Sequence, residues 1–190
     1  NVPESTTSFI GRTYDVDSVR ALLRGEGRLV TITGPGGVGK SRLALEASRA
    51  ADAQFRDGVW LVELAQVSDP TLVLGEVARP FGVVNAPGEG LREAVVRAMR
   101  ARELLLVLDN CEHLLTSAGE VVDLLLRACP RIRVLATSRE RLRLSGETTY
   151  VLPTLAMARD PIARASDAMQ FSAIELFVDR ARRLDGVNFR

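Results

Sequence analysis

The stretch that decides the fold is LVTITGPGGVGKSRLALEA, residues 29–47. It opens with a β-rich apolar run, passes through a glycine cluster and ends in a segment whose apolar residues recur at helical spacing. Residues 34–41, GPGGVGKS, lie between the predicted strand and the predicted helix and match G-x-x-x-x-G-K-[ST] at every required position. The stretch therefore predicts a phosphate-binding loop that follows the first strand of a parallel sheet.

The residue types of this loop suit an anion. Its four glycines let backbone N–H groups turn toward a phosphate without obstruction by a Cβ, and the helix that follows adds its amino-terminal dipole and free amides. The Ser41 hydroxyl is a predicted ligand of Mg²⁺. The predicted nucleotide-binding residues here are Gly34, Pro35, Gly36, Gly37, Val38, Gly39, Lys40, Ser41 and Arg42.

Lys40 is the only lysine of the chain, whereas its 25 Lys and Arg residues are otherwise all arginine. A compact ammonium with three rotatable donors fits between the β- and γ-phosphates under a tight glycine loop. A planar guanidinium fork is too wide for that position. The sequence therefore predicts that Lys40 contacts the phosphates and that arginine cannot replace it.

A second predicted anchor lies in ELLLVLDN, residues 103–110, a continuous apolar run that ends in a carboxylate. Such a run is typical of a central strand buried on both faces, and parallel sheets bind ligands at the carboxyl ends of their strands. We therefore predict that Asp109 binds the Mg²⁺ of a bound nucleotide.

In all, five β-type runs alternate with helical patterns, which is typical of an α/β fold. The predicted strands are residues 28–33, 58–64, 103–110, 132–137 and 148–153, and the predicted helices are about residues 40–50, 70–81, 90–101, 117–128 and 172–184. By analogy with ATPases that carry an additional strand, the fourth strand is expected between the first and the third. The predicted fold is a three-layer α/β/α P-loop NTPase with a five-stranded parallel sheet of order 5-1-4-3-2.

This strand order brings TSRE, which ends the fourth strand, beside the terminal phosphate. Arg139 is therefore the predicted γ-phosphate sensor. Hydrolysis is predicted to be slow, because Asn110 follows Asp109 where a carboxylate usually polarises the attacking water. An amide can orient water but cannot accept its proton, and Glu112 is the next carboxylate. The candidate catalytic residues are Lys40, Asp109, Asn110, Glu112 and Arg139.

Composition sets the class of protein. The chain is 46% hydrophobic and 26% charged with a formal net charge of +1, which fits a globular domain with no nucleic-acid or membrane surface.

Cys111 and Cys129 are predicted to be reduced core residues, and His113 is predicted to be structural. With no signal peptide, the predicted location is the cytoplasm. Guanine specificity is not expected, because a base-reading N-K-x-D motif needs a lysine outside the loop.

The predicted domains are a P-loop nucleotide-binding domain of residues 1–153 and the start of an incomplete helical domain, residues 154–190. The helical domain is indicated by a change to Ala-rich composition after residue 153 and by a capping box formed by Ser172 and Glu175.

Five stretches resemble one family: FIGR, GPGGVGKSRLALEAS, DGVWLVELAQVSDP, LLLVLDNCEHLL and CPRIRVLATSRERLRLSGETTYVL. They are similar to the nucleotide-binding domain of bacterial STAND ATPases, also called NB-ARC or NOD-like, and within these to the central ATPase of SARP/AfsR-type and large LuxR-type transcriptional regulators. The resemblance covers nearly the whole chain.

The resemblance implies a switch that is closed with ADP and opens when ATP replaces it. It also implies an N-terminal DNA-binding domain and a C-terminal sensor domain in the same parent protein, with oligomerisation of the parent on activation. Ile10, Gly11 and Arg12 would line the adenine, residues 34–41 would be the Walker A loop, Asp109 the Walker B acid and Arg139 the first sensor.

The chain departs from the family in two places. Residues 13–15 are Thr-Tyr-Asp, whereas the family motif continues Glu-x-Glu. The family's Gly-Leu-Pro stretch, whose proline closes over adenine, is absent, so weakened nucleotide affinity is expected.

Two alternatives to the switch stay open. One is a stand-alone P-loop enzyme, either a kinase or an AAA-type ATPase. The other is a scaffold that binds nucleotide for stability only, or binds none.

Overall fold

The computed structural model describes residues 9–155 and 172–185. The chain divides into two compact units, and the larger contains Asp15–Leu152. In the smaller unit the described residues include α7 (Ser172–Asp185), which begins at the predicted capping residue. The division into a P-loop domain of residues 1–153 and a helical domain from residue 154 stays a prediction.

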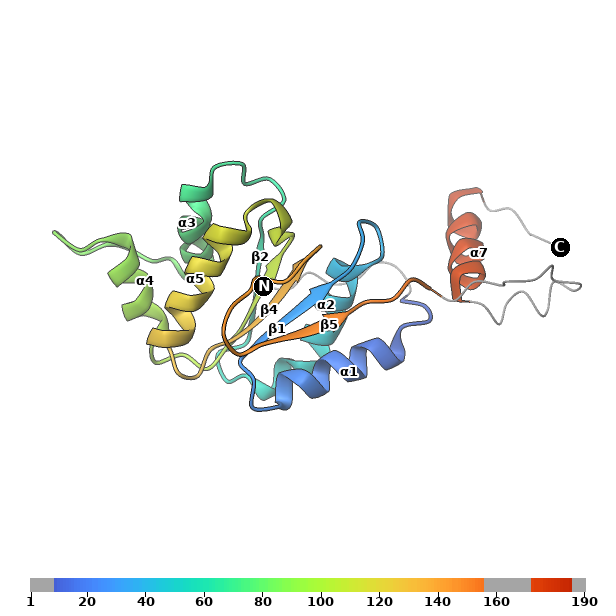
Figure 1. Cartoon of the computed structure of the whole chain (residues 1–190), viewed down its shortest axis with the longest axis horizontal. Coiled ribbons are helices and arrows are strands. Elements are labelled where there is room, and N and C mark those ends of the chain that lie inside the picture. The colour runs from blue at the N-terminus through green and yellow to red at the C-terminus, as the bar shows by residue number, and fades with distance from the viewer. Residues whose placement is uncertain (1–8, 156–171, 186–190) are drawn as a thin grey trace, which may run out of the picture. The chain divides into compact units, whose positions relative to one another are not determined.

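The larger unit is built on a sheet of five parallel strands (Figure 1). The strands are β1 (Leu29–Thr33), β2 (Val59–Glu63), β3 (Leu105–Asp109), β4 (Arg133–Ser138) and β5 (Glu147–Val151). Their order is β2-β3-β4-β1-β5, so β4 lies between β1 and β3. The predicted fold class and strand order are confirmed.

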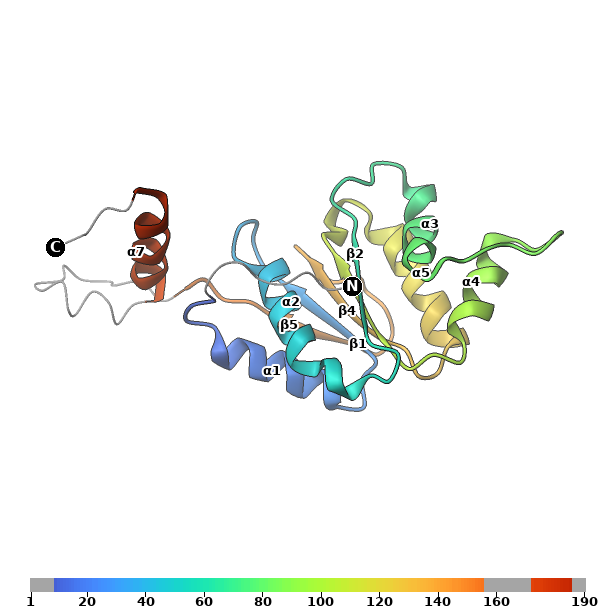
Figure 2. The ribbon, with the colours of Figure 1, turned by 180° about the vertical axis from the view of Figure 1, so that it is seen from behind.

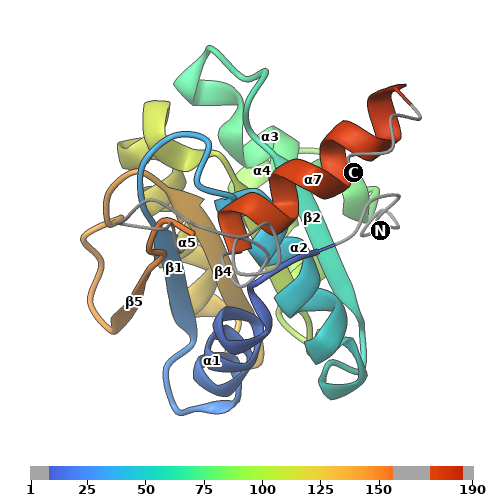
Figure 3. The ribbon, with the colours of Figure 1, turned by 90° about the vertical axis from the view of Figure 1, so that its right-hand side faces the viewer.

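Helices cover both faces of this sheet (Figures 2 and 3). They are α1 (Thr13–Arg24), α2 (Lys40–Ala51), α3 (Val73–Ala78), α4 (Leu91–Met99) and α5 (Leu115–Ala128). Figure 3 shows α2 on one side of β4 and α5 on the opposite side. The arrangement has the three layers that the alternating sequence pattern predicts.

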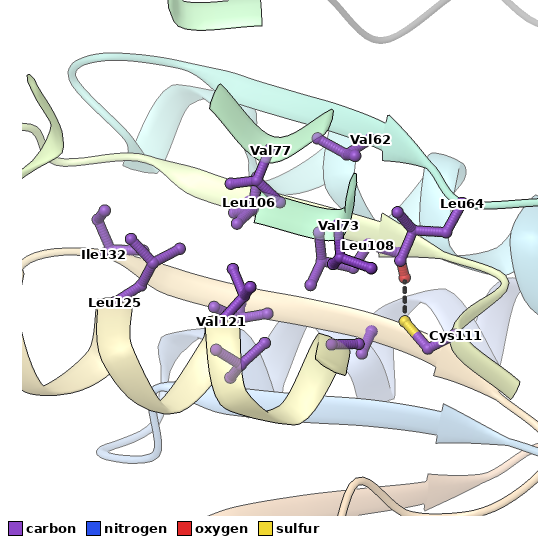
Figure 4. Packing of buried hydrophobic residues seen from close by; sticks show 14 of the residues in the cluster. Val62, Leu64, Val73, Val77, Leu106, Leu108, Cys111, Val121, Leu125 and Ile132 are labelled. Atoms are coloured by element: carbon purple, nitrogen blue, oxygen red, sulfur yellow. Dashed lines mark hydrogen bonds between the residues drawn. The ribbon is translucent and has the colours of Figure 1, made fainter. Parts of the chain in front are cut away.

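The core lies between the sheet and helices α3, α4 and α5. Figure 4 shows the part that packs against α3 and α5. Leu106 and Leu108 of β3 face this cluster, and alternate strand residues point to the other face of a sheet. Leu105 and Val107 are also fully buried but lie outside the cluster, so β3 is covered on both faces. This double burial explains why its sequence is a continuous apolar run.

Two segments differ from the sequence prediction. The helix α1 was not predicted, although the buried Val19 and Leu23 have the four-residue spacing of one helical face. The single helix predicted over residues 70–81 is divided into η2 (Pro70–Leu72), α3 and η3 (Arg79–Phe81). A proline stands in each of the two 3₁₀ turns, and proline lacks the N–H that a continuous helix needs.

Cys111 and Cys129 are both free and buried, which confirms their predicted core positions. The Cys111 thiol donates to the backbone oxygen of Leu108 at 3.5 Å (Figure 4). Burial, with a smaller effect from the charge of Asp109, raises the pKa of this thiol to about 12. Among the described helices, none is both long and apolar enough to cross a membrane.

Candidate functional site

Three strand ends meet at one edge of the sheet. Thr33, the last residue of β1, is paired with Ser138, the last residue of β4. In the adjacent pair, Leu108 of β3 lies opposite Ala136, which brings Asp109 to the level of Thr137. The loop after β1, the carboxylate that ends β3 and the residues after β4 therefore start side by side.

The glycine-rich loop (residues 34–41) joins β1 to α2 in a conformation that favours glycine. Gly37 and Gly39 have φ angles of 76° and 99°, and a Cβ on either would meet no atom within 4 Å. The backbone angle, not crowding, is therefore the reason for glycine at both positions. Pro35, Gly36 and Gly37 are exposed, so this cradle is open to a ligand from solvent.

Lys40 begins α2 and turns its side chain back into the loop. Its Nζ donates to the backbone oxygens of Gly34 at 3.0 Å and Pro35 at 3.1 Å. The residue is only 7% exposed, and a buried ammonium is stable only when hydrogen-bonded. The loop itself thus holds the cation in the place where the sequence predicts contact with phosphate.

Asp109 is fixed by a hydroxyl from the neighbouring strand. Thr137, which is 1% exposed, donates from Oγ1 to Oδ1 of Asp109 at 2.5 Å. Thr137 Oγ1 also accepts the backbone N–H of Asn110 at 2.9 Å. Because a hydroxyl has one proton and the amide can only donate, this proton goes to the carboxylate. Sequence reasoning missed this contact, although a polar Thr ending an apolar strand was a signal for it.

Asn110 has a left-handed backbone with a φ of 67°, which Asn tolerates better than most residues. Its side-chain Nδ2 lies 3.5 Å from Nδ1 of His113, and Nε2 of His113 lies 2.9 Å from the backbone oxygen of Val67. A carbonyl only accepts, so Nε2 carries the proton and Nδ1 accepts from Asn110. His113 therefore ties Asn110 to the segment after β2, in agreement with its predicted structural role.

Arg139 leaves β4 beside the glycine-rich loop. A Cβ on Gly36 would lie 3.7 Å from Nη2 of Arg139, so the guanidinium is against the loop. Its Nε makes an ion pair of 3.2 Å with Oε1 of Glu112, which lies in η4 (Cys111–His113) after β3. The structure thus brings together Gly36, Arg139 and Glu112, a contact that the sequence does not reveal.

The remaining predicted site residues lie elsewhere or make other contacts. Ser41 is exposed in the first turn of α2. Arg42 makes an ion pair with Glu46 at 3.5 Å, one turn along the same helix. Ile10, Gly11 and Arg12 belong to the smaller unit, so their contact with adenine stays a prediction.

A divalent cation would find oxygen ligands here but not a protein-only cage. Within residues 9–155 and 172–185, His, Cys, Asp and Glu side chains nowhere gather in a group of three or more. The Ser41 hydroxyl and the Asp109 carboxylate are hard oxygen donors of the kind that Mg²⁺ prefers. Such sites leave the other ligand positions to water and substrate phosphates.

Comparison with known proteins agrees with this geometry. A family model described as an AAA domain matches residues 23–148. An uncharacterized protein of Mycobacterium tuberculosis is 42% identical over 94% of the chain, and the match covers 42% of that protein. A putative HTH-type transcriptional regulator of the same organism is 40% identical over 87% of the chain and 17% of its own length. The regulatory protein AfsR of Streptomyces griseus is 30% identical over 74% of the chain and 15% of its own length.

Among solved structures, the chain is similar to a STAND protein with a tetratricopeptide repeat sensor from Pyrococcus horikoshii. The TM-score is 0.54 at 16% identity, over 80% of this chain and 24% of that one, which shows a shared fold. The chain spans less than half the length of the curated relatives it matches. It belongs to the AAA domain family of P-loop ATPases, as a domain that also occurs in proteins named as a putative HTH-type transcriptional regulator and as a regulatory protein.

Proposed function

We propose that this chain is the ATP- and ADP-binding switch of a bacterial transcriptional regulator, with slow Mg²⁺-dependent hydrolysis of ATP. The observation that carries the proposal is the convergence of the glycine-rich loop, Asp109 and Arg139 at one edge of the sheet. DNA binding and signal sensing would belong to other domains of the same parent protein, and the parent would oligomerise on activation. The regulators among its relatives support this assignment.

Binding would use groups that already face the loop. Lys40 Nζ would exchange the carbonyls of Gly34 and Pro35 for phosphate oxygens, which are stronger partners because they carry charge. Ser41 and Asp109 would hold Mg²⁺, which neutralises phosphate charge when bound. Thr137 keeps the Asp109 carboxylate in one orientation before any ligand arrives.

Slow hydrolysis follows from the groups around Asp109. Asn110 can orient a water molecule through its side-chain oxygen but cannot take its proton. The other carboxylate near the site, Glu112, lies in η4, beyond Asn110, and not directly after Asp109. A switch benefits from this arrangement, because the triphosphate state then lasts long enough to be read by other domains.

Isothermal titration of the purified chain with ATP, ADP and GTP, with and without Mg²⁺, tests the proposal. We expect binding of ATP and ADP, no binding of GTP, and loss of binding in Lys40→Ala. Arg127→Ala is the matched control, because it removes an exposed cation of α5 that pairs only with Asp123 among the contacts described.

Three results would contradict parts of the proposal. Absence of heat with both adenine nucleotides would favour the scaffold alternative. Rapid phosphoryl transfer to a small acceptor would favour a kinase. Fast steady-state release of phosphate would contradict the slow hydrolysis predicted from Asn110.

A further inference from the structure

We infer that Glu112 sets the preference of this site between nucleoside triphosphate and diphosphate, by competing with the terminal phosphate for Arg139. The inference rests on the proposed function, since it assumes that nucleotide binds at the glycine-rich loop. It assigns Glu112 a positioning and specificity role instead of the role of a general base.

The first support is the position of the Arg139 side chain. It is 68% exposed and held at one end by Glu112, with Nε 3.2 Å from Oε1, while its guanidinium lies against Gly36. The loop's other cation, Lys40, is already bound to two loop carbonyls. Both cations that would meet phosphate are therefore hydrogen-bonded to protein groups. The partners of Lys40 are neutral carbonyls, whereas the partner of Arg139 is a charged carboxylate.

The second support is the environment of Glu112. Its side chain is only 18% exposed. Its second oxygen, Oε2, is buried and makes no hydrogen bond with any of the residues that the structure describes. A buried carboxylate with an unpaired oxygen is poorly stabilised, so it depends on the partner of its other oxygen. Removing Arg139 from this pair is therefore unfavourable for Glu112.

Competition between two anions for one guanidinium gives selectivity. A diphosphate that reaches Lys40 and the loop amides leaves the pair of Arg139 and Glu112 intact. A triphosphate brings a further anion to the Gly36 side of the loop, and Arg139 leaves Glu112 to meet it. Only the triphosphate state therefore includes the loss of the ion pair, which lowers ATP affinity relative to ADP.

Glu112→Gln tests this, because glutamine keeps the shape and hydrogen-bonding oxygen but removes the charge. We expect the ratio of the ADP to the ATP dissociation constant, measured by titration with Mg²⁺, to rise about fivefold, the upper range for a partly exposed ion pair. In Arg139→Gln the ratio should fall, and adding Glu112→Gln to that variant should change nothing further.

Glu140→Gln is the matched control. Glu140 is next to Arg139 in the sequence, but its side chain pairs with Arg143 at 2.8 Å, so this variant removes the same charge without touching the Arg139 pair. The ratio should stay unchanged in this variant. A second measurement follows the NMR signal of the Arg139 Nε–H group. In the wild-type chain ATP should shift this signal toward its position in Glu112→Gln, and ADP should leave it in place.

The outcomes distinguish the competition from nucleotide binding itself. If Glu112→Gln raises ATP and ADP affinity equally, the charge acts on all phosphates alike, and the competition is refuted while nucleotide binding stands. The competition is also refuted if ADP shifts the Arg139 signal as much as ATP does, or if Glu112→Gln still changes the ratio when Arg139 is replaced. If the wild-type chain binds neither nucleotide, the proposed function and this inference both fail.

Discussion

At the scale of single residues, Lys40 is the position at which we expect even a conservative replacement by arginine to impair nucleotide binding. Its ammonium lies between two loop carbonyls and is almost fully buried. A guanidinium is planar and larger, so Lys40→Arg should lower ATP affinity by about 10-fold to 100-fold or more, the loss of one or two charged hydrogen bonds. Titration of the variant measures this, and circular dichroism confirms that it is folded. Wild-type affinity in Lys40→Arg would refute the role given to the lysine.

Thr137 supports a second residue-scale prediction. Thr137→Val would leave the Asn110 N–H and the Asp109 carboxylate without their shared partner, so it should lower the free energy of unfolding by about 1–3 kcal/mol. Urea unfolding measures the loss. Thr137→Ser keeps the hydroxyl and is the control. We also expect the valine variant to lose more nucleotide affinity with Mg²⁺ than without it, and an equal loss would mean that Thr137 does not act through Asp109.

At the scale of elements, the segment before α4 is held by one carboxylate. Glu89 accepts from both Nε and Nη2 of Arg97, at 2.9 and 2.8 Å, and from the backbone N–H of Ala86 at 2.9 Å. The hydrogen bonds from Arg97, followed by the one from Ala86, lower the pKa of Glu89 from 4.5 to about 2. In the unfolded chain Glu89 has its ordinary pKa and binds a proton first as the pH falls.

The stability that Glu89 contributes therefore depends on pH. The contribution of Glu89 to stability is fully present above its ordinary pKa and is lost as the pH falls from that value through about 2. Glu89→Gln should therefore be less stable than the wild type at pH 7, and the difference should shrink below that ordinary pKa. Denaturant unfolding at several pH values measures it. A difference that is constant with pH would show that the charge of Glu89 does not contribute.

The strands and the helix α1 differ in how well the sequence predicts them. All five strands were predictable, because β-rich runs and the glycine-rich loop give strong local signals, whereas their order was predicted by analogy with ATPases that carry an additional strand. The helix α1 was missed, since its amphipathic face is narrow and part of its support comes from outside it. Asp15 accepts a hydrogen bond of 2.5 Å from Tyr150 of β5, which lies 135 residues away in the sequence.

The proximity of the main candidate site residues was predictable to a similar degree, whereas their roles stay predictions. Motif and strand order identified the loop, Asp109 and Arg139 as neighbours. The partners of these groups could not be predicted, because they depend on exact backbone placement. Glu112 follows the left-handed backbone of Asn110 in η4, and its ion pair with Arg139 joins residues that are 27 positions apart in the sequence.

At the scale of the whole molecule, both cysteines report on global unfolding. Cys111 and Cys129 belong to the same core cluster, and burial raises the pKa of each thiol. At pH 8 neither should react with a thiol reagent while the chain is folded, and both should react in denaturant. The labelling rate at intermediate denaturant should follow the unfolded fraction. Rapid labelling of one cysteine under native conditions would show a local opening of the core.

The chain that follows β5 is joined by a hydrogen bond to the residue before the glycine-rich loop. Leu152 donates its N–H to the oxygen of Thr33 at 2.8 Å, and a Cβ on Gly34 would lie 3.1 Å from the Leu152 oxygen. The polypeptide therefore leaves the strand layer beside the first residue of the glycine-rich loop. Because this hydrogen bond lies at the end of the β1–β5 pair, a displacement of the chain after residue 152 should be transmitted directly to the start of the glycine-rich loop.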